Sequence, residues 1–307
     1  MKKVFIDGSA GTTGLRIRER LEKREDVELI TLPEELRKEV SARKEALNAA
    51  DVAFLCLPDA AAVESASLVE NPNTVVIDTS TAHRVDEIWT YGFAELAGMR
   101  SKISVAKRIA NPGCHASGFI ALVAPLVENG IVDRTAQLCA FSLTGYSGGG
   151  KKMIADYERT LKEDGVEYLG GRQYALGQTH KHLPEMKKYC SLDNSPVFSP
   201  IVVPHLSGME VTVQLHDVSL AAIKDCYREY YKNAKLVKFD EKLDKDGFVS
   251  SAELSGRDDL LVGAYGNDER VVLVSLFDNL GKGASGAALQ NMNIALGVDE
   301  TEGLIIG

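Results

Sequence analysis

The stretch that decides the fold is KVFIDGSAGTTG at residues 3–14. Its apolar residues Val4, Phe5 and Ile6 predict a short buried strand. A glycine-rich turn follows directly, and the apolar spacing of residues 15–21 predicts an amphipathic helix. A strand, a glycine turn and a helix in this order are typical of a dinucleotide-binding βα unit, whose helix N-terminus receives the pyrophosphate.

Further apolar runs extend this unit into a domain. Residues 27–32, 51–57 and 74–77 read as strands buried on both faces, separated by charged or alanine-rich helical segments. This alternation predicts an α/β fold with a doubly wound, Rossmann-type parallel sheet.

The pattern changes after about residue 115. The apolar runs at 136–143, 200–215 and 271–277 are longer and more alternating, and residues 283–296 form an alanine-rich helix. These features predict a second, α+β domain with a mostly antiparallel sheet. We expect residues 1–114 with 283–307 to form the dinucleotide-binding domain. Residues 115–282 should form the domain for catalysis, substrate binding and oligomerisation.

The bulk composition excludes several classes of protein. The chain of 307 residues has a net charge of −9 and no basic stripe, which argues against a nucleic-acid partner. No apolar run approaches the roughly 18 residues of a membrane helix. The five cysteines are spread without a CxxC pair, so neither a disulfide framework nor a zinc site is expected. We expect a cytoplasmic protein without a bound metal.

The glycine turn predicts the cofactor contacts. Its glycines allow the backbone to approach the pyrophosphate, and its hydroxyls add donors. At the end of the second strand, where an NAD site usually has an acid, the chain has Thr31. Arg37 and Lys38 follow and favour the extra phosphate of NADP, although Glu34 and Glu35 lie beside them. The predicted cofactor residues are Gly8, Ser9, Gly11, Thr12, Thr13, Gly14, Arg37 and Lys38.

Cys114 is the predicted nucleophile. Pro112 and Gly113 predict a turn directly before it, and the apolar residues after it predict a buried helix. A thiol at a helix N-terminus has a lowered pKa, and the thiolate is the attacking species. We expect the other four cysteines to be small buried apolar residues. His115 is not expected to be the base, because adjacent side chains point apart on a helix.

The segment QTHKHLPE at 178–185 supplies candidates for proton transfer. His180 or His182 could exchange a proton near neutral pH, and Glu185 could orient the histidine.

Binding of a substrate phosphate or carboxylate requires positively charged side chains. Arg84 follows a strand end, and Lys151 follows the mobile glycine loop expected at 145–150. These two are the better candidates among several basic residues.

The chain resembles the N-acetyl-gamma-glutamyl-phosphate reductases of arginine biosynthesis, specifically their shorter form. The matching motifs are GSAGTTG at 8–14, DTSTAHR at 78–84, ANPGCHASGF at 110–119, HKHLPE at 180–185 and NLGKGASGAALQNMN at 279–293. The resemblance implies Cys114, His180, His182 and Glu185 as catalytic residues. It further implies Asn279 beside the nicotinamide, and Arg84, Asn111 and Lys282 at the substrate. His115 and Lys151 replace the tyrosine and arginine usual in the family, and lysine cannot make the bidentate contact of arginine.

The resemblance implies NADPH-dependent reduction of N-acetyl-glutamyl 5-phosphate to the semialdehyde through a Cys114 thioester. Two related reactions remain as alternatives: that of an aspartate-semialdehyde dehydrogenase, and reduction of an acyl phosphate on a carrier protein. A non-catalytic dinucleotide-binding protein is a third, although it would lack the nucleophile and base seen here. We expect a small-molecule substrate and a homo-oligomer, either a dimer or a tetramer.

Overall fold

A computed structural model describes residues 1–162 and 166–307, which form two units, each with its own sheet. Unit 1 comprises Met1–Pro112 and Ala284–Leu304, and unit 2 comprises Gly113–Gly283 and Ile305–Gly307. Among the described residues, no helix has the length and apolar character needed to cross a bilayer. Unit 1 is thus assembled from two stretches that lie on either side of unit 2 in the sequence.

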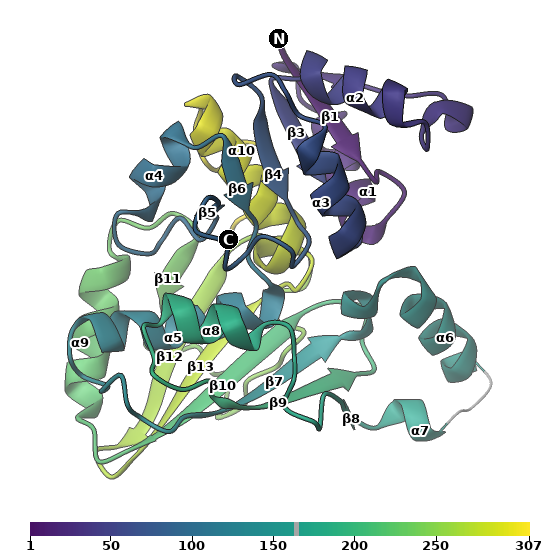
Figure 1. Cartoon of the computed structure of the whole chain (residues 1–307). Coiled ribbons are helices and arrows are strands. Elements are labelled where there is room, and N and C mark those ends of the chain that lie inside the picture. Colours follow the sequence, from purple (N-terminus) through teal and green to yellow (C-terminus); the bar gives the residue numbers. More distant parts are fainter. Residues whose placement is uncertain (163–165) are drawn as a thin grey trace. The chain divides into compact units, whose positions relative to one another are not determined.

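Unit 1 is built on a six-stranded sheet in which every strand pair is parallel (Figure 1). The strand order is β2-β1-β3-β4-β6-β5, so the direction of winding reverses between β1 and β3. The strands are β1 (Lys2–Asp7), β2 (Val27–Ile30), β3 (Val52–Leu55), β4 (Val75–Asp78), β5 (Thr90–Tyr91) and β6 (Arg108–Ala110). In such sheets ligands bind at the carboxyl ends of the strands near the reversal.

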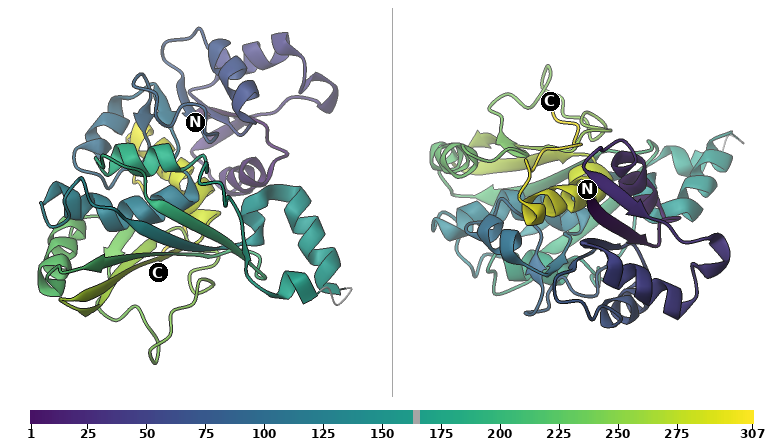
Figure 2. Two further views of the ribbon diagram at one scale, coloured as in Figure 1. Left: turned by 60° about the horizontal axis from the view of Figure 1, so that its bottom comes forward. Right: turned by 90° about the horizontal axis from the view of Figure 1, so that it is seen from above.

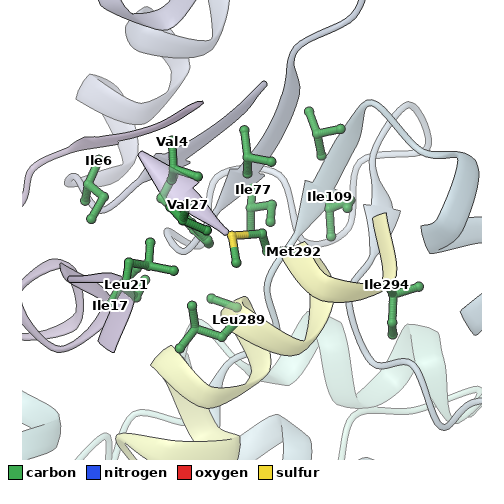
Figure 3. Close-up of a cluster of buried hydrophobic side chains, with 14 of the residues drawn as sticks. Val4, Ile6, Ile17, Leu21, Val27, Ile77, Ile109, Leu289, Met292 and Ile294 are labelled. Carbon is green, nitrogen blue, oxygen red and sulfur yellow. The ribbon is translucent and has the colours of Figure 1, made fainter. Parts of the chain in front are cut away.

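Helices cover both faces of this sheet, which confirms the doubly wound prediction. The helices are α1 (Thr12–Leu21), α2 (Val40–Ala49), α3 (Asp59–Ser67), α4 (Met99–Val105) and α10 (Gly286–Leu296), with a short 3₁₀ turn η1 (Glu34–Leu36). Figure 3 shows Ile17 and Leu21 of α1 and Leu289 and Met292 of α10 packed in one core with strand residues such as Ile77. The second core lies on the other face and is formed with α2 and α3.

Unit 2 contains a seven-stranded sheet of order β11-β12-β13-β10-β7-β9-β8. Its strands are β7 (Cys139–Gly145), β8 (Arg172–Gln173), β9 (Val197–Val203), β10 (Met209–His216), β11 (Val237–Phe239), β12 (Leu260–Asn267) and β13 (Arg270–Phe277). The pairs β7–β9 and β11–β12 are parallel, and the other pairs are antiparallel. The predicted, mostly antiparallel sheet is therefore confirmed, as a mixed sheet.

Helices lie on one face of this second sheet (Figure 1). They include α5 (Cys114–Glu128), which packs on β10 and β13, and α9 (Leu220–Tyr231), which packs on β12. The remaining helices of the unit are α6 (Gly150–Lys162), α7 (Val166–Leu169) and α8 (Leu183–Tyr189). The segment between β11 and β12 covers part of the opposite face through Leu243 and Leu254 (Figure 2).

Two sequence predictions needed correction. The apolar run at 200–215 is not one strand but parts of β9 and β10, because the chain turns at Gly208, whose φ of +118° suits glycine. The last helix begins at Gly286 rather than at residue 283. It is preceded by a π-helical turn, η3 (Gly281–Ser285), in which Asp278 O accepts from the N–H groups of Gly281 and Gly283.

Candidate active site

Cys114 is the first residue of α5, in unit 2. Gly113 is the N-cap with extended backbone angles, and its carbonyl accepts the first helical bond, from Ser117 N–H. The thiol thus lies at the first N–H groups of the helix, which have no acceptor within the helix itself, and at the positive end of its dipole. Both effects favour the thiolate and the oxyanion of an adduct on it.

Glycines hold the nucleophile close to its neighbours. A Cβ on Gly283 would lie 2.8 Å from Cβ of Cys114, so the π-helical turn passes directly beside the nucleophile. Gly118, one turn into α5, faces the sheet, and a Cβ there would lie 2.5 Å from Val211 and 2.8 Å from Phe277. π-Helical turns are rare and occur often at functional sites.

The predicted HKHLPE element joins the nucleophile through its glutamate. Glu185 lies on α8 and is almost fully buried, and its Oε2 accepts a hydrogen bond of 2.9 Å from Gly113 N–H. This bond connects residues 72 positions apart and fixes the turn that precedes Cys114. Orientation of a histidine by Glu185 remains a prediction.

The two candidate histidines lie together and close to His115. The rings of His180 and His182 have centroids 4.7 Å apart, and they lie 5.3 and 5.5 Å from the ring of His115. His180 Nδ1 accepts a hydrogen bond of 3.1 Å from the backbone N–H of His182. His182 is buried and is the N-cap residue of α8.

His115 belongs to this cluster, although sequence reasoning set it aside. Its Nδ1 is 2.7 Å from Oγ of Ser142, and its Nε2 is 2.8 Å from the hydroxyl of Tyr174. Burial, and then the repulsion from His180 when both rings are protonated, lower the pKa of His115 to about 3. A neutral ring with so low a pKa is a very weak base and holds no extra proton to donate, which agrees with the expectation that His115 is not the base.

The glycine loop expected at 145–150 contains a 3₁₀ turn, η2 (Tyr146–Gly149). The N–H groups of Tyr146 and Ser147 connect it to the carbonyls of His205 and Leu206. Asn279 is buried against the same turn. Its Nδ2 donates to Ser147 Oγ and its Oδ1 accepts from Gly208 N–H.

The predicted cations of unit 2 differ in exposure. Lys151 is exposed in the first turn of α6, whereas Lys282 is almost fully buried in the π-helical turn beside Gly283. Among the described residues, no group of three or more His, Cys, Asp or Glu side chains is placed to hold a metal ion.

The other four cysteines fall into two classes. Burial raises the pKa of the Cys56 thiol to about 12, and it also raises the pKa of Cys190 and Cys226. Such thiols are poor nucleophiles. Cys139 corrects the sequence prediction, because it is exposed at the start of β7, where alternate side chains point away from α5.

In unit 1 the glycine turn closes one end of a pocket of about 440 Å³. Gly8 has a φ of +90°, and a Cβ there would lie 2.3 Å from Cys56 O, so only glycine fits. The pocket lies at the carboxyl ends of β1, β2 and β3, beside the reversal between β1 and β3. Its polar lining includes Asp7, Ser9, Arg18, Thr31, Glu34, Arg37, Lys38 and Arg43.

Two predicted substrate residues of unit 1 are buried and tied to the backbone. Arg84 Nη2 donates to Thr79 O at 3.0 Å. Asn111 Nδ2 donates to Ala284 O at 3.0 Å, and its Oδ1 accepts from Asn291. The loop of Arg84 is held by Asp78, whose Oδ2 lies 2.7 Å from Nδ1 of His83. Their contact with substrate remains a prediction.

Comparison with known proteins assigns the family. The model of the semialdehyde dehydrogenase NAD-binding domain matches residues 3–105, and that of the dimerisation domain matches residues 114–279. Curated relatives from Brucella ovis and Brucella anthropi, both named N-acetyl-gamma-glutamyl-phosphate reductase, are 45% identical over 309 residues. The alignments cover 96% of this chain and 99% and 98% of the two relatives. The chain belongs to the N-acetyl-gamma-glutamyl-phosphate reductase family.

Solved structures of other enzymes share the fold of this chain. Aspartate semialdehyde dehydrogenases from Francisella tularensis and Vibrio cholerae match with TM-scores of 0.73 and 0.72. Each match covers 96% of this chain and 98–99% of the other chain, but at only 15–16% identity. The likeness therefore establishes a shared fold, and the reductase relatives at 45% identity disfavour the aspartate alternative.

Sequence reasoning missed three parts of the site. Tyr174 and Ser142 belong to no recognised motif, and they meet His115 only through the tertiary fold. Arg18 lies on α1, one helical turn after Gly14, and lines the pocket with Arg37 and Lys38. A signal for Arg18 was present, because residues four positions apart, such as Gly14 and Arg18, lie on the same face of a helix.

Proposed function

We propose that the chain catalyses NADPH-dependent reduction of N-acetyl-glutamyl 5-phosphate to N-acetyl-glutamate 5-semialdehyde and phosphate, as the names of its relatives indicate for arginine biosynthesis. One observation carries the proposal. Cys114 opens helix α5, and Glu185 of the histidine element binds the residue immediately before it. A nucleophile and a proton donor are thereby held in one unit.

The first step is attack by the Cys114 thiolate on the acyl carbon. The carbon–oxygen bond to phosphate breaks, phosphate leaves with the electron pair, and a thioester remains on Sγ. The N–H groups at the start of α5 stabilise the negative oxygen of the tetrahedral adduct. An acyl phosphate is already activated, so the protein's main task in this step is to orient the two reacting groups.

When bound, NADPH supplies the hydride that reduces the thioester carbon. The resulting oxyanion takes a proton from a histidine, giving a thiohemiacetal. This then returns its hydroxyl proton to the histidine as the carbon–sulfur bond breaks, which releases the aldehyde and restores the thiolate.

Between the two candidates, the hydrogen bonds favour His182 as the acid and base. His180 Nδ1 accepts from a backbone N–H, so its neutral ring carries the proton on Nε2. For Nε2 to accept a proton, the ring proton would first have to move to Nδ1, which would break that bond. In this proposal His180 positions His182, because it accepts the hydrogen bond from the His182 backbone and its ring lies 4.7 Å from the buried His182 ring.

The residues of unit 1 fit NADP(H). The glycine turn leaves room that a Cβ at Gly8 or Gly14 would fill, and α1 begins directly after it. At the end of β2 the pocket presents Thr31 together with Arg18, Arg37 and Lys38. Three cations and no acid at the position of Thr31 suit a ribose 2′-phosphate rather than a free diol.

A homo-oligomer, a dimer or a tetramer, is proposed through the face of the second sheet opposite α5. Phe141, Val197 and Val272 alternate with inward-facing residues on β7, β9 and β13, and their side chains are 45%, 56% and 36% exposed. These strands lie in the region, residues 114–279, that matches the model of a dimerisation domain. We propose that a second copy of the chain covers this apolar face.

We also propose a cytoplasmic location, since all five cysteines are free.

The test is phosphate- or arsenate-dependent reduction of NADP by the purified protein. It is offered N-acetyl-glutamate semialdehyde and, separately, aspartate semialdehyde. Activity on the acetylated substrate that disappears in Cys114→Ala, and persists in Cys139→Ala as a matched exposed-thiol control, is expected. Activity on aspartate semialdehyde alone would refute the substrate, and retained activity in Cys114→Ala would refute the mechanism.

A further inference from the structure

Ser142, His115 and Tyr174 form a chain of hydrogen bonds beside the nucleophile that the reaction above does not use. The His115 ring lies between two hydroxyl groups, at 2.7 Å from Ser142 Oγ and 2.8 Å from the Tyr174 hydroxyl. Ser142 belongs to β7, His115 follows Cys114 on α5, and Tyr174 follows β8. The chain therefore connects three elements of unit 2 at the start of α5.

The ring of His115 is neutral, which limits how its protons are arranged. Burial, and then the repulsion from His180 when both rings are protonated, lower its pKa to about 3, far below any working pH. A neutral imidazole has one nitrogen that donates and one that accepts. One of the two hydroxyl groups, that of Ser142 or that of Tyr174, must therefore donate to the ring, and the other must accept from it.

Ser142 decides which nitrogen donates. Its side chain is fully buried, and across residues 1–162 and 166–307 His115 Nδ1 is the one hydrogen-bond partner of its hydroxyl. A buried donor left unused costs about 1–3 kcal/mol, so the serine proton points to Nδ1. The ring proton then lies on Nε2 and is donated to the oxygen of Tyr174.

Tyr174 consequently keeps its own proton for another acceptor. Burial, and then the charge of Cys114, raise the pKa of Tyr174 well above its usual value, so the hydroxyl stays protonated. The hydroxyl is bonded to His115, the residue that follows Cys114 at the start of α5. The Tyr174 ring further lies 5.7 Å from the ring of His180.

We propose that Tyr174 donates a hydrogen bond to the acyl oxygen of the substrate bound to Cys114, and that His115 and Ser142 are the residues that position it. The inference rests on the proposed function, because it needs an acyl group on Cys114. That oxygen becomes negative when the thiolate attacks and again when the thioester is reduced. A donor fixed in advance stabilises both states without reorganisation.

The proton arrangement can be tested without any substrate. Heteronuclear NMR of the ring nitrogens identifies the tautomer of each histidine, and comparison with His115→Gln assigns the signals of His115. A neutral ring with its proton on Nε2 between pH 5 and 8 is expected. A proton on Nδ1, or protonation of the ring in this range, would overturn the proposal whether or not the proposed substrate is correct.

Kinetics test the role of the hydroxyl. Tyr174→Phe should lower kcat/KM about a hundredfold, the usual loss for one donor to a developing oxyanion. His115→Leu should lower it by a similar factor, and the double variant should be no worse than either single variant, because both remove the same hydrogen bond. His115→Gln, whose amide can still donate to Tyr174, should recover most of the activity.

Three controls separate this role from a structural one. The pH profile should keep its shape in Tyr174→Phe, and alkylation of Cys114 should stay at the wild-type rate. Tyr265→Phe, which removes a hydroxyl bonded to Asp244 N–H elsewhere in unit 2, should be unchanged. Wild-type activity in Tyr174→Phe, or additive losses in the double variant, would refute the inference while leaving the proposed reaction intact.

Discussion

At the scale of single residues, Gly283 is needed because of what lies beside it. A Cβ at this position would be 2.8 Å from Cβ of Cys114, closer than such atoms approach in folded proteins. Gly283→Ala should displace the nucleophile and lower kcat at least about tenfold, since small misplacements of reacting groups are costly. Gly170→Ala is the matched control, because a Cβ there meets no atom within 4 Å. Equal kcat values for the two variants would contradict this explanation.

Cofactor choice is also decided by individual side chains. Arg37→Ala and Lys38→Ala should each raise the KM for NADPH about tenfold and leave the KM for NADH unchanged, because we propose that each cation binds the 2′-phosphate. Steady-state kinetics with both cofactors measure the effect. Lys23→Ala is an exposed control outside the pocket. A parallel rise with both cofactors would place the two cations elsewhere on the dinucleotide.

His115 gives the stability of the protein a predictable dependence on pH. Its folded pKa of about 3 lies below the unfolded value of 6.5, so only the unfolded chain binds the proton between these values. The stabilisation is complete above pH 6.5 and is lost as the pH falls. Its slope is about 1.4 kcal/mol per pH unit. Urea unfolding at pH 7 and pH 5 should show a loss about 2 kcal/mol larger in wild type than in His115→Gln. Equal losses would show that His115 is protonated in the folded state.

At the scale of elements, α5 and α9 are joined by an unusual set of hydrogen bonds. Pro125 lies inside α5 and has no N–H, so the carbonyl of Ala121 loses its helical donor. The hydroxyl of Tyr231 on α9 donates to that carbonyl at 2.7 Å. Tyr227 donates to the next carbonyl, that of Leu122, at 2.6 Å. The proline that interrupts one helix thereby helps to dock the other.

This arrangement predicts a dependence between two substitutions. Tyr231→Phe should reduce the free energy of unfolding by about 1–3 kcal/mol, because it leaves a buried carbonyl unsatisfied. In a Pro125→Ala background the restored N–H can serve Ala121, so the same substitution should cost less. Tyr227→Phe is the control, since Leu122 keeps a helical donor in both backgrounds. Equal costs of Tyr231→Phe with and without Pro125 would refute the compensation.

At the scale of the whole molecule, the open face of the second sheet predicts the behaviour of the protein in solution. If a substitution placed a charge on this apolar face, formation of the oligomer would bury that charge without a partner, at a cost of several kcal/mol. Phe141→Lys should therefore shift the protein toward monomer in sedimentation experiments. Ile88→Lys, at a site 82% exposed in unit 1, should leave the oligomer unchanged. An unaffected oligomer in Phe141→Lys would exclude this face.

The sequence by itself determined the features that depend on neighbours along the chain. The glycine turn after β1 follows from residues 3–14, because strand, turn and helix each have a local pattern. The position of Cys114 at a helix N-terminus follows from Pro112, Gly113 and the apolar run after them. The doubly wound sheet follows from the alternation of buried strands and helices.

Only the tertiary structure decided which distant side chains meet. Glu185 binds Gly113 across 72 positions, and His115 meets Tyr174 across 59. No periodicity encodes such pairs, since they depend on how α5, α8 and the β7–β9 strands pack. The same reason explains why His115, set aside from its position next to Cys114, proved to lie among the other histidines. A side chain's direction on a helix is local, but the partners found in that direction are set by the fold.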